Sequence, residues 1–210
     1  MSAEAIVKPS LAEASRALLV ERVLDAVGEL LAEKSWGNVS MAAIAGRAGV
    51  SRQTLYNSFG NRQELAQAYV MREGERFVTA VGEAVRGHRD PSEALRAALE
   101  LFLVAAAPHP LVRAITAGEG EELLPLVTTR GAPLVEFVTQ RLALVIDENW
   151  PGIPSPEVQL LSDCLVRLAL SHAALPAGPA PRAASDLAYV LGPHLDRLVA
   201  GIEAAGASSD

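Results

Sequence analysis

The sequence predicts an all-α protein in which a small N-terminal head of three helices precedes a larger helical body. Three observations carry this prediction. Apolar side chains recur at helical spacing over most of the chain, no sustained apolar and polar alternation indicates a strand, and Pro and Gly clusters divide the chain into segments of helical length. With 210 residues, 50% of them hydrophobic, the chain is long enough to bury a core.

The first helix is expected from about Ser15 to Glu33, after a flexible arm of residues 1–14. Its apolar side chains form one stripe at helical spacing. The stripe comprises Val20, Val23, Leu24, Val27, Leu30 and Leu31. The segment SWGN at 35–38 then breaks the pattern, so the helix is expected to end before it.

Two short helices follow, and their ends are marked in the sequence. Ser40 and Ser51 are expected to cap helix N-termini, since each follows a valine and precedes an aliphatic residue that completes a hydrophobic staple. Gly49 fits the left-handed residue that ends one helix and turns the chain into the next. Asn61 is expected to cap a further helix, with Glu64 completing a capping box. This order predicts a helix-turn-helix.

Longer helical patterns make up the body, separated by Pro and Gly breaks. They cover about 62–87, 91–107, 110–117, 120–129, 132–148, 156–175 and 183–204. The helix at 156–175 has little polar face, and the helix at 183–204 carries a long apolar stripe. These last two helices predict a homodimer built on a four-helix interface with a second copy. The alternative is that both complete a monomeric core.

The net charge of −7 is unevenly distributed along the chain. Residues 1–70 hold seven basic and seven acidic side chains, whereas the remaining 140 residues hold 11 basic and 18 acidic ones and account for the whole excess. Between Ser40 and Arg62 there are three arginines and no acid. Because phosphate neutralisation acts within a Debye length of about 8 to 10 Å, a local basic surface on an acidic protein suits DNA binding.

Several other classes are disfavoured. The longest clean apolar run, 101–107, falls short of the roughly 18 residues that cross a bilayer, so no membrane partner is expected. The N-terminus does not read as a secretion signal, and a cytoplasmic location follows by default. The sole cysteine, Cys164, excludes an internal disulfide and a multi-cysteine metal site, and we expect it to be buried as a small hydrophobe.

Catalysis is also disfavoured. The four histidines are scattered, none lies at i, i+4 from another metal-type ligand, and no nucleophile is recognisably paired with a base. These histidines are His88, His109, His172 and His194. We therefore expect no enzyme, no metal and no cofactor.

The helix from Arg52 to Phe59 carries the most informative surface. At about 100° per residue, Leu55 and Phe59 share one buried side. The rest of the helix presents hydrogen-bonding side chains without a carboxylate, which suits a helix lying in a DNA major groove. The alternative is an ordinary solvated surface helix.

The stretch VGELLAEKSWGNVSMAAIAGRAGVSRQTLYNSFGNRQEL, Val27 to Leu65, resembles the N-terminal DNA-binding domain of the TetR family of bacterial transcriptional regulators. The resemblance implies an all-helical homodimer with a helix-turn-helix head at 15–65, a body at 66–205 that binds a small molecule, and a tail at 206–210. It departs from the family pattern at Gln53, where a small residue is frequent, and at Arg62, where lysine is more usual.

Carried over by position, the resemblance also implies DNA contacts. Ser40 and Ser51 would cap helices and touch phosphate. Thr54, Tyr56 and Arg62 would hold the DNA backbone, and Arg47 would make a flanking phosphate contact. The base readers that the resemblance implies are Arg52, Gln53 and Asn57.

If the resemblance holds, an effector pocket lies among the helices between 91 and 175. The residues expected in its wall are Phe102, Leu103, Leu111, Ile115, Leu126, Phe137, Leu161, Leu165 and His172, and ordinary core packing is the alternative for each. Because these helices are apolar with few interior charges, a hydrophobic or amphipathic effector is favoured.

The sequence thus predicts a sequence-specific transcriptional regulator that binds double-stranded operator DNA. We expect a repressor that a small-molecule effector releases from a palindromic operator. One alternative is a helical binding or scaffold protein whose head no longer reads DNA. Another is a TetR-like activator, which no residue excludes.

Overall fold

The computed structural model describes residues 10–118 and 122–207. Over these ranges every regular element is a helix. The chain forms two units, a head of residues 1–69 and a body of residues 70–210. Most of the arm expected at 1–14 and of the tail expected at 206–210 lies outside the described residues.

The head is built from α1 (Leu11–Glu33), the 3-10 turn η1 (Trp36–Asn38), α2 (Met41–Ala48), α3 (Arg52–Phe59) and the beginning of α4 (Arg62–Val85). Apolar side chains from each of these elements are buried together. The most deeply buried ones include Val23, Val27, Trp36, Ile44, Leu55, Leu65 and Tyr69. The helix-turn-helix of α2 and α3 is therefore anchored on α1 and on the first turns of α4.

The expected helix caps of the head are confirmed. Ser40 Oγ accepts a hydrogen bond from Ala43 N at 3.2 Å. Ser51 Oγ accepts one from Thr54 N at 3.0 Å. Gly49 has φ 65° and ψ 36°, the left-handed conformation that a residue without Cβ adopts at little cost.

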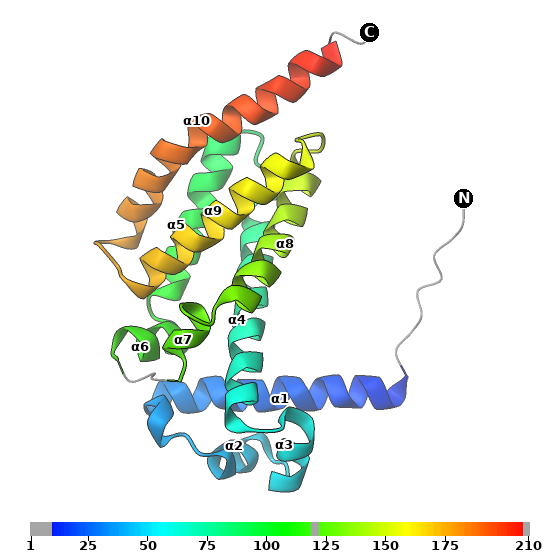
Figure 1. Ribbon diagram of the computed structural model, residues 1–210, viewed down its shortest axis with the longest axis vertical. Coiled ribbons are helices and arrows are strands. Elements are labelled where there is room, and N and C mark those ends of the chain that lie inside the picture. The colour runs from blue at the N-terminus through cyan, green and yellow to red at the C-terminus, as the bar shows by residue number, and fades with distance from the viewer. Residues whose placement is uncertain (1–9, 119–121, 208–210) are drawn as a thin grey trace. The chain divides into compact units, whose positions relative to one another are not determined.

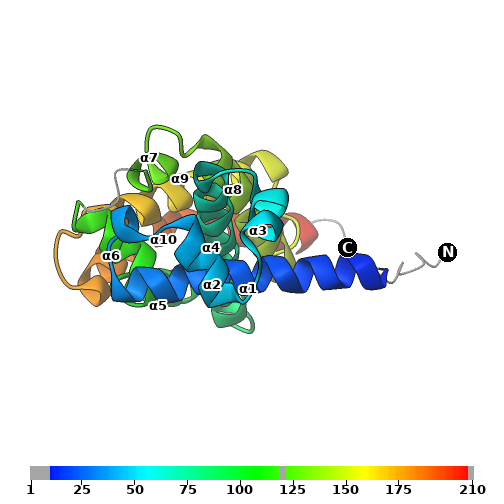
Figure 2. The same ribbon diagram turned by 90° about the horizontal axis from the view of Figure 1, so that it is seen from below.

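The expected start of the first helix at Ser15 is wrong, because α1 begins four residues earlier. Ser10 Oγ accepts from Glu13 N at 3.2 Å, and Ser10 N donates to the Glu13 carboxylate at 2.7 Å. This reciprocal capping box satisfies two backbone donors at the true helix start. In Figures 1 and 2 the N-terminal half of α1 extends past α2 and α3.

The body comprises the rest of α4 with α5 (Pro91–Ala106), α6 (Pro110–Thr116), α7 (Leu124–Val127), α8 (Ala132–Asn149), α9 (Ser155–Ala174) and α10 (Ala180–Ala207). Two helices differ from expectation by more than two residues at their start. The helix expected at 120–129 is reduced to the single turn α7. The last helix starts at Ala180, because Pro181 lies in its first turn, where a missing N–H costs nothing.

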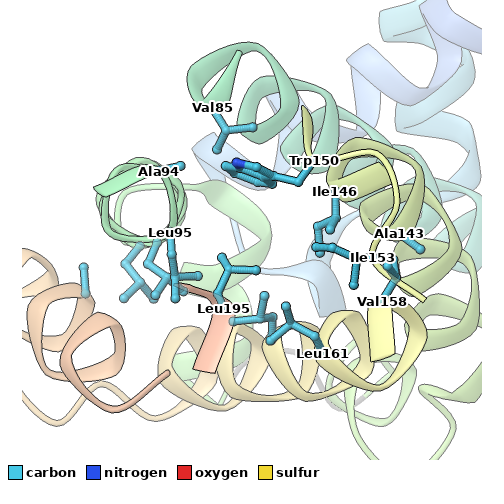
Figure 3. Packing of buried hydrophobic residues seen from close by; sticks show 14 residues of the cluster. Val85, Ala94, Leu95, Ala143, Ile146, Trp150, Ile153, Val158, Leu161 and Leu195 are labelled. Carbon is cyan, nitrogen blue, oxygen red and sulfur yellow. The ribbon is translucent and has the colours of Figure 1, made fainter. Parts of the chain in front are cut away.

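The core of the body lies where α5, α8, α9 and α10 meet (Figure 3). Trp150 and Ile153, at the turn between α8 and α9, join this cluster, and Leu95 and Leu195 bring α5 and α10 together in it. Gly192 allows close approach of α10 to α5, since a Cβ at this position would clash with the Ser92 side chain. Cys164, expected to be buried, is exposed on α9, so that expectation is wrong.

In the ranges that the structure describes, no single helix is both long and apolar enough to span a membrane. The helices α5 and α6, which meet at a bend of 73°, meet the length and composition criterion only when they are taken together.

Candidate nucleic-acid interface and ligand pocket

The surface of α3 has the polarity that the sequence predicts. Leu55 and Phe59 are buried in the head, at 0% and 8% exposure. The side chains that remain exposed on α3 are Arg52, Gln53, Tyr56 and Asn57. None of them is acidic, so the outer side of this helix presents donors and acceptors without negative charge.

Two pairs of polar side chains on this surface bond to each other. Gln53 Nε2 donates to Asn57 Oδ1 at 2.8 Å. The hydroxyls of Ser51 and Thr54 lie 2.8 Å apart. These contacts hold the side chains on one turn of helix, and the amide bond between Gln53 and Asn57 would be exchanged for base edges when the helix enters a groove.

Arg47 is engaged by two acids of α1. Its guanidinium lies 3.1 Å from Glu29 Oε2 and 2.9 Å from Glu33 Oε2. Hydrogen bonding to Glu33 and then to Glu29 raises the pKa of Arg47 above its ordinary range. The segment 40–62 contains no acid in sequence, but the fold brings two carboxylates to one of its arginines.

Arg62 is engaged as well, with the turn that precedes α2. Its Nη2 donates to the Trp36 carbonyl at 2.5 Å, and its guanidinium carbon lies 4.6 Å from the Trp36 ring centroid. Hydrogen bond and cation–π contact together fix the start of α4 on η1. Of the three arginines between Ser40 and Arg62, only Arg52 has no hydrogen bond or ion pair to another described residue.

Sequence reasoning missed Arg22, which supports the turn of the helix-turn-helix. Its Nη2 donates to the Ala48 carbonyl at 2.6 Å. A cation at the C-terminal end of α2 satisfies a carbonyl that the helix leaves unpaired and complements the helix dipole. Only a contact across 26 residues reveals this role, so no local pattern could have predicted it.

The body contains an apolar cavity of about 140 Å³. Of the nine residues expected in its wall, four line it, namely Phe102, Leu111, Ile115 and Leu165. Leu103 and Leu161 belong instead to the buried core. Leu126 is buried elsewhere, and Phe137 and His172 are half-buried outside the cavity wall.

One wall of the cavity comes from α4, outside the range 91–175 where the pocket was expected. Its residues on α4 are Val70, Glu73, Gly74, Phe77, Val78 and Val81. Gly74 allows close approach of α8, because a Cβ there would lie 2.8 Å from Leu134 Cδ1. The spacing of these residues along α4 is helical and could have indicated a packed face, but not a cavity.

Of the described residues in the cavity wall, Glu73 is the one that is charged, and its side chain is 5% exposed. Its Oε1 accepts from Arg72 at 2.9 Å (Nε) and 2.6 Å (Nη2), and Arg76 Nη1 lies 3.7 Å away. Its Oε2 lies 3.1 Å from His109 Nε2. Burial raises the pKa of Glu73, but hydrogen bonds from His109 and Arg72 and the charge of Arg72 outweigh it, so the pKa is lowered.

His109 connects this carboxylate to the start of α6. Its Nδ1 accepts a hydrogen bond from Leu111 N at 3.3 Å, so the ring proton belongs on Nε2, which donates to Glu73. The ring of Phe77 lies beside it, with centroids 5.1 Å apart, and Phe77 also meets Phe102 edge to face at 5.1 Å. Polar and aromatic groups thus join α4, α5 and α6 at one end of the cavity.

Comparison with known families and proteins bears on both units. A family described as bacterial regulatory proteins of the tetR family matches residues 23–69. A second, described as the C-terminal domain of the bacterial tetracyclin repressor, matches residues 90–193. Together they account for most of the head and of the body.

Individual relatives agree with these matches. The HTH-type transcriptional regulator AlkX of Mycobacterium tuberculosis is 37% identical over 188 residues, which is 89% of each chain. The crystal structure of AlkX from a Dietzia strain, a TetR family repressor implicated in biodegradation of n-alkanes, has a TM-score of 0.78 and 34% identity, and covers 84% of this chain and 97% of that one. The transcriptional activator FasR of Mycolicibacterium smegmatis is 36% identical over 81 residues, 39% of this chain and 37% of FasR.

Proposed function

The chain belongs to the TetR family of bacterial regulatory proteins, and from that premise we propose that it is a dimeric repressor, which a small apolar effector releases from a palindromic operator. As a member of this family it is a DNA-binding transcriptional regulator with a helix-turn-helix head. The observation that carries the proposal furthest is the exposed surface of α3, which is polar and free of acids. Its action on operator DNA would place it in the bacterial cytoplasm.

The proposed DNA contacts divide into base readers and phosphate contacts. Arg52, Gln53 and Asn57 are exposed on α3 and have the side chains that bind guanine or adenine edges in the major groove. The proposed phosphate contacts are Ser40, Arg47, Ser51, Thr54, Tyr56 and Arg62. Because Arg47 is paired with two glutamates and Arg62 with Trp36, these two would act mainly by holding the head in shape, and would reach phosphate only by exchanging partners.

The proposed dimer would form through α9 and α10. Both helices expose large apolar side chains, since Leu160 of α9, Leu175 directly after α9, and Tyr189 and Val190 of α10 are between 65% and 85% exposed. A second copy that covered them would give the four-helix interface expected from the sequence. A two-fold dimer places two α3 helices in successive major grooves, about 34 Å apart on one face of the DNA, which is why the operator would be palindromic.

The apolar cavity supports an apolar effector. The described part of its wall is hydrocarbon apart from Glu73, and the Dietzia relative is implicated in biodegradation of n-alkanes, so we favour an aliphatic compound over a sugar or nucleotide. Repression would be relieved by a population shift. The dimer would have one conformation in which the two α3 helices fit the operator and another in which their spacing is wrong. An effector that binds the second conformation more tightly weakens operator affinity, and the extent is set by the ratio of its affinities for the two conformations.

Activation is a second candidate for the direction of control. A relative named as an activator, FasR, matches part of this chain at 36% identity. The proposed DNA contacts would be the same, and only the position of the operator relative to the promoter would differ.

The proposed function is tested by fluorescence anisotropy of the full chain with the DNA that flanks its own gene, at physiological salt with nonspecific competitor. We expect tight, saturable binding. The logarithm of the association constant should fall linearly with the logarithm of the salt concentration, with a slope of roughly 0.9 for each phosphate contact. Tyr56→Ala should weaken binding to every sequence alike. Failure on this DNA and on a random-sequence selection would mean that the head does not read DNA, which leaves a helical binding or scaffold protein.

A further inference from the structure

Among the residues that the structure describes, the wall of the cavity contains one charged side chain. Glu73 lies among hydrocarbon side chains, and the side chains that bind or approach its carboxylate, Arg72, Arg76 and His109, are not among the wall residues. A ligand in the cavity therefore has Glu73 beside it, and not the side chains that pair with Glu73.

The two oxygens of this carboxylate are not equally occupied. Oε1 receives two hydrogen bonds from Arg72 and has Arg76 close by. Oε2 has one partner among the described residues, Nε2 of His109. A carboxylate oxygen has two lone pairs that accept hydrogen bonds, so Oε2 retains one acceptor position.

The ionised state of Glu73 follows from its surroundings. Despite its burial, the hydrogen bonds from His109 and Arg72 lower its pKa, so the side chain is a carboxylate at neutral pH and accepts hydrogen bonds without donating any. A group that can only accept hydrogen bonds requires a donor from whatever occupies the space beside it.

We propose that the effector is an uncharged aliphatic compound whose polar end is a hydrogen-bond donor, such as a primary alcohol, and that this end binds Oε2 of Glu73. The geometry disfavours a carboxylate ligand, because its negative charge would be buried beside a second carboxylate in an apolar site. It also disfavours a plain hydrocarbon, which would leave the acceptor position of Oε2 unused.

The size of the cavity limits the ligand. A dry cavity of about 150 Å³ in another protein holds a benzene molecule, so 140 Å³ accommodates a group of about six carbon atoms without rearrangement. Six-carbon probes are therefore the appropriate test. The inference rests on the proposed function only in taking this cavity as the effector site.

The experiment compares three probes by isothermal titration calorimetry with the full chain at pH 7. Hexan-1-ol carries the donor, methyl pentyl ether is its isomer without a donor, and hexanoate carries the negative charge. We expect hexan-1-ol to bind about 10- to 100-fold more tightly than the ether, the ratio for one hydrogen bond to a charged acceptor. Hexanoate should bind more weakly than both.

Two variants assign the effect to one side chain. Glu73→Gln keeps the size and removes the charge, so the preference for hexan-1-ol should shrink and the penalty on hexanoate should largely disappear. Glu75→Gln is the matched control, because Glu75 lies two residues along α4, outside the cavity wall, and pairs with Arg141 at 2.8 Å. It should leave all three affinities unchanged. If Glu73→Gln does not fold, the ratios of the three probe affinities in the unaltered protein still test the inference.

The inference is overturned if the alcohol and the ether bind equally, if hexanoate binds as tightly as hexan-1-ol, or if none of the three binds. An operator titration on the same preparation separates this failure from failure of the proposed function. Release from DNA by hexanoate would overturn the inference and keep the regulator. If the protein prefers hexan-1-ol but its operator affinity does not change, the inference stands and the proposal that the effector releases the protein from DNA is wrong.

Discussion

The proposed DNA surface of the head takes most of its residues from α3 and its cap, whereas the cavity of the body takes its wall from six helices, α4 to α9. On α3, alternation of buried and exposed residues along one helix determines both the packing and the chemistry. In the cavity, the space exists because small and large side chains from distant segments fail to fill it. A single substitution in the head should therefore change either stability or DNA binding, whereas a single substitution in the cavity wall should change both stability and ligand binding.

The largest effect should come from two adjacent residues of α3, of which one is buried and the other exposed. Leu55→Ala removes a side chain with 0% exposure and should lower the free energy of unfolding of the head by about 2 to 5 kcal/mol. Tyr56→Ala removes a side chain that is 47% exposed, so it should change the free energy of unfolding by roughly 0.5 kcal/mol or less while it weakens DNA binding. Urea unfolding followed by circular dichroism measures both. If both variants lost the same unfolding free energy, α3 would not have one side that stabilises the head and another that binds DNA.

The next effect concerns base reading on the exposed side of α3. Gln53→Ala should reduce discrimination at one base pair by about 1 to 3 kcal/mol, while affinity for nonspecific DNA changes little. Anisotropy titrations against half-site variants measure it, with Tyr56→Ala as the variant that should weaken all sequences alike. If Gln53→Ala still discriminates fully among the half-site variants, Gln53 does not read a base.

A smaller effect is expected from filling the cavity. Ala98 lines it, and Ala98→Leu would place three more carbons in the space, so thermal stability should rise by about 0.5 to 2 kcal/mol and effector response should be lost. Ala105→Leu is the control, since Ala105 is exposed on the same helix, α5. A stable Ala98→Leu protein that still responds would show that the effector binds elsewhere.

The smallest effect is a pH dependence of the body. The pKa of Glu73 is lower in the fold than in the unfolded chain, so its ionised form adds stability above the ordinary glutamate pKa of about 4.3, and this contribution is lost as pH falls through the lower folded value. Glu73→Gln should therefore lose stability less steeply than the unaltered protein over that acidic interval. Chemical denaturation at several pH values tests this, and parallel curves would contradict it.

Sequence reasoning predicted the head well because its signals are local. Caps at Ser40 and Ser51, the left-handed glycine at Gly49 and the exposed side of α3 each depend on residues a few positions apart. The charge of the head surface was predicted less well. Two of the three arginines between Ser40 and Arg62 are engaged by partners that are 14 or more residues away in sequence, so counting local acids could not reveal them.

The cavity could be predicted only in part. Four of nine expected wall residues line it, because apolar residues of a helical body look alike in sequence whether they fill a core or border a space. Glu73 was missed because a Glu next to arginines on a long helix is typical of a solvated surface. Its burial and its bond to His109 depend on where α6 begins relative to α4.

By itself, the sequence determined the all-helical fold, the positions of most helices and the acid-free surface of α3, because helical periodicity, caps and breaks act between residues within about two turns of one another. The tertiary structure alone decided that Arg47 and Arg62 have partners, that α4 forms a wall of the cavity and that Glu73 is buried in that wall. These features depend on which side chains meet across different helices, and that is settled only when the helices pack.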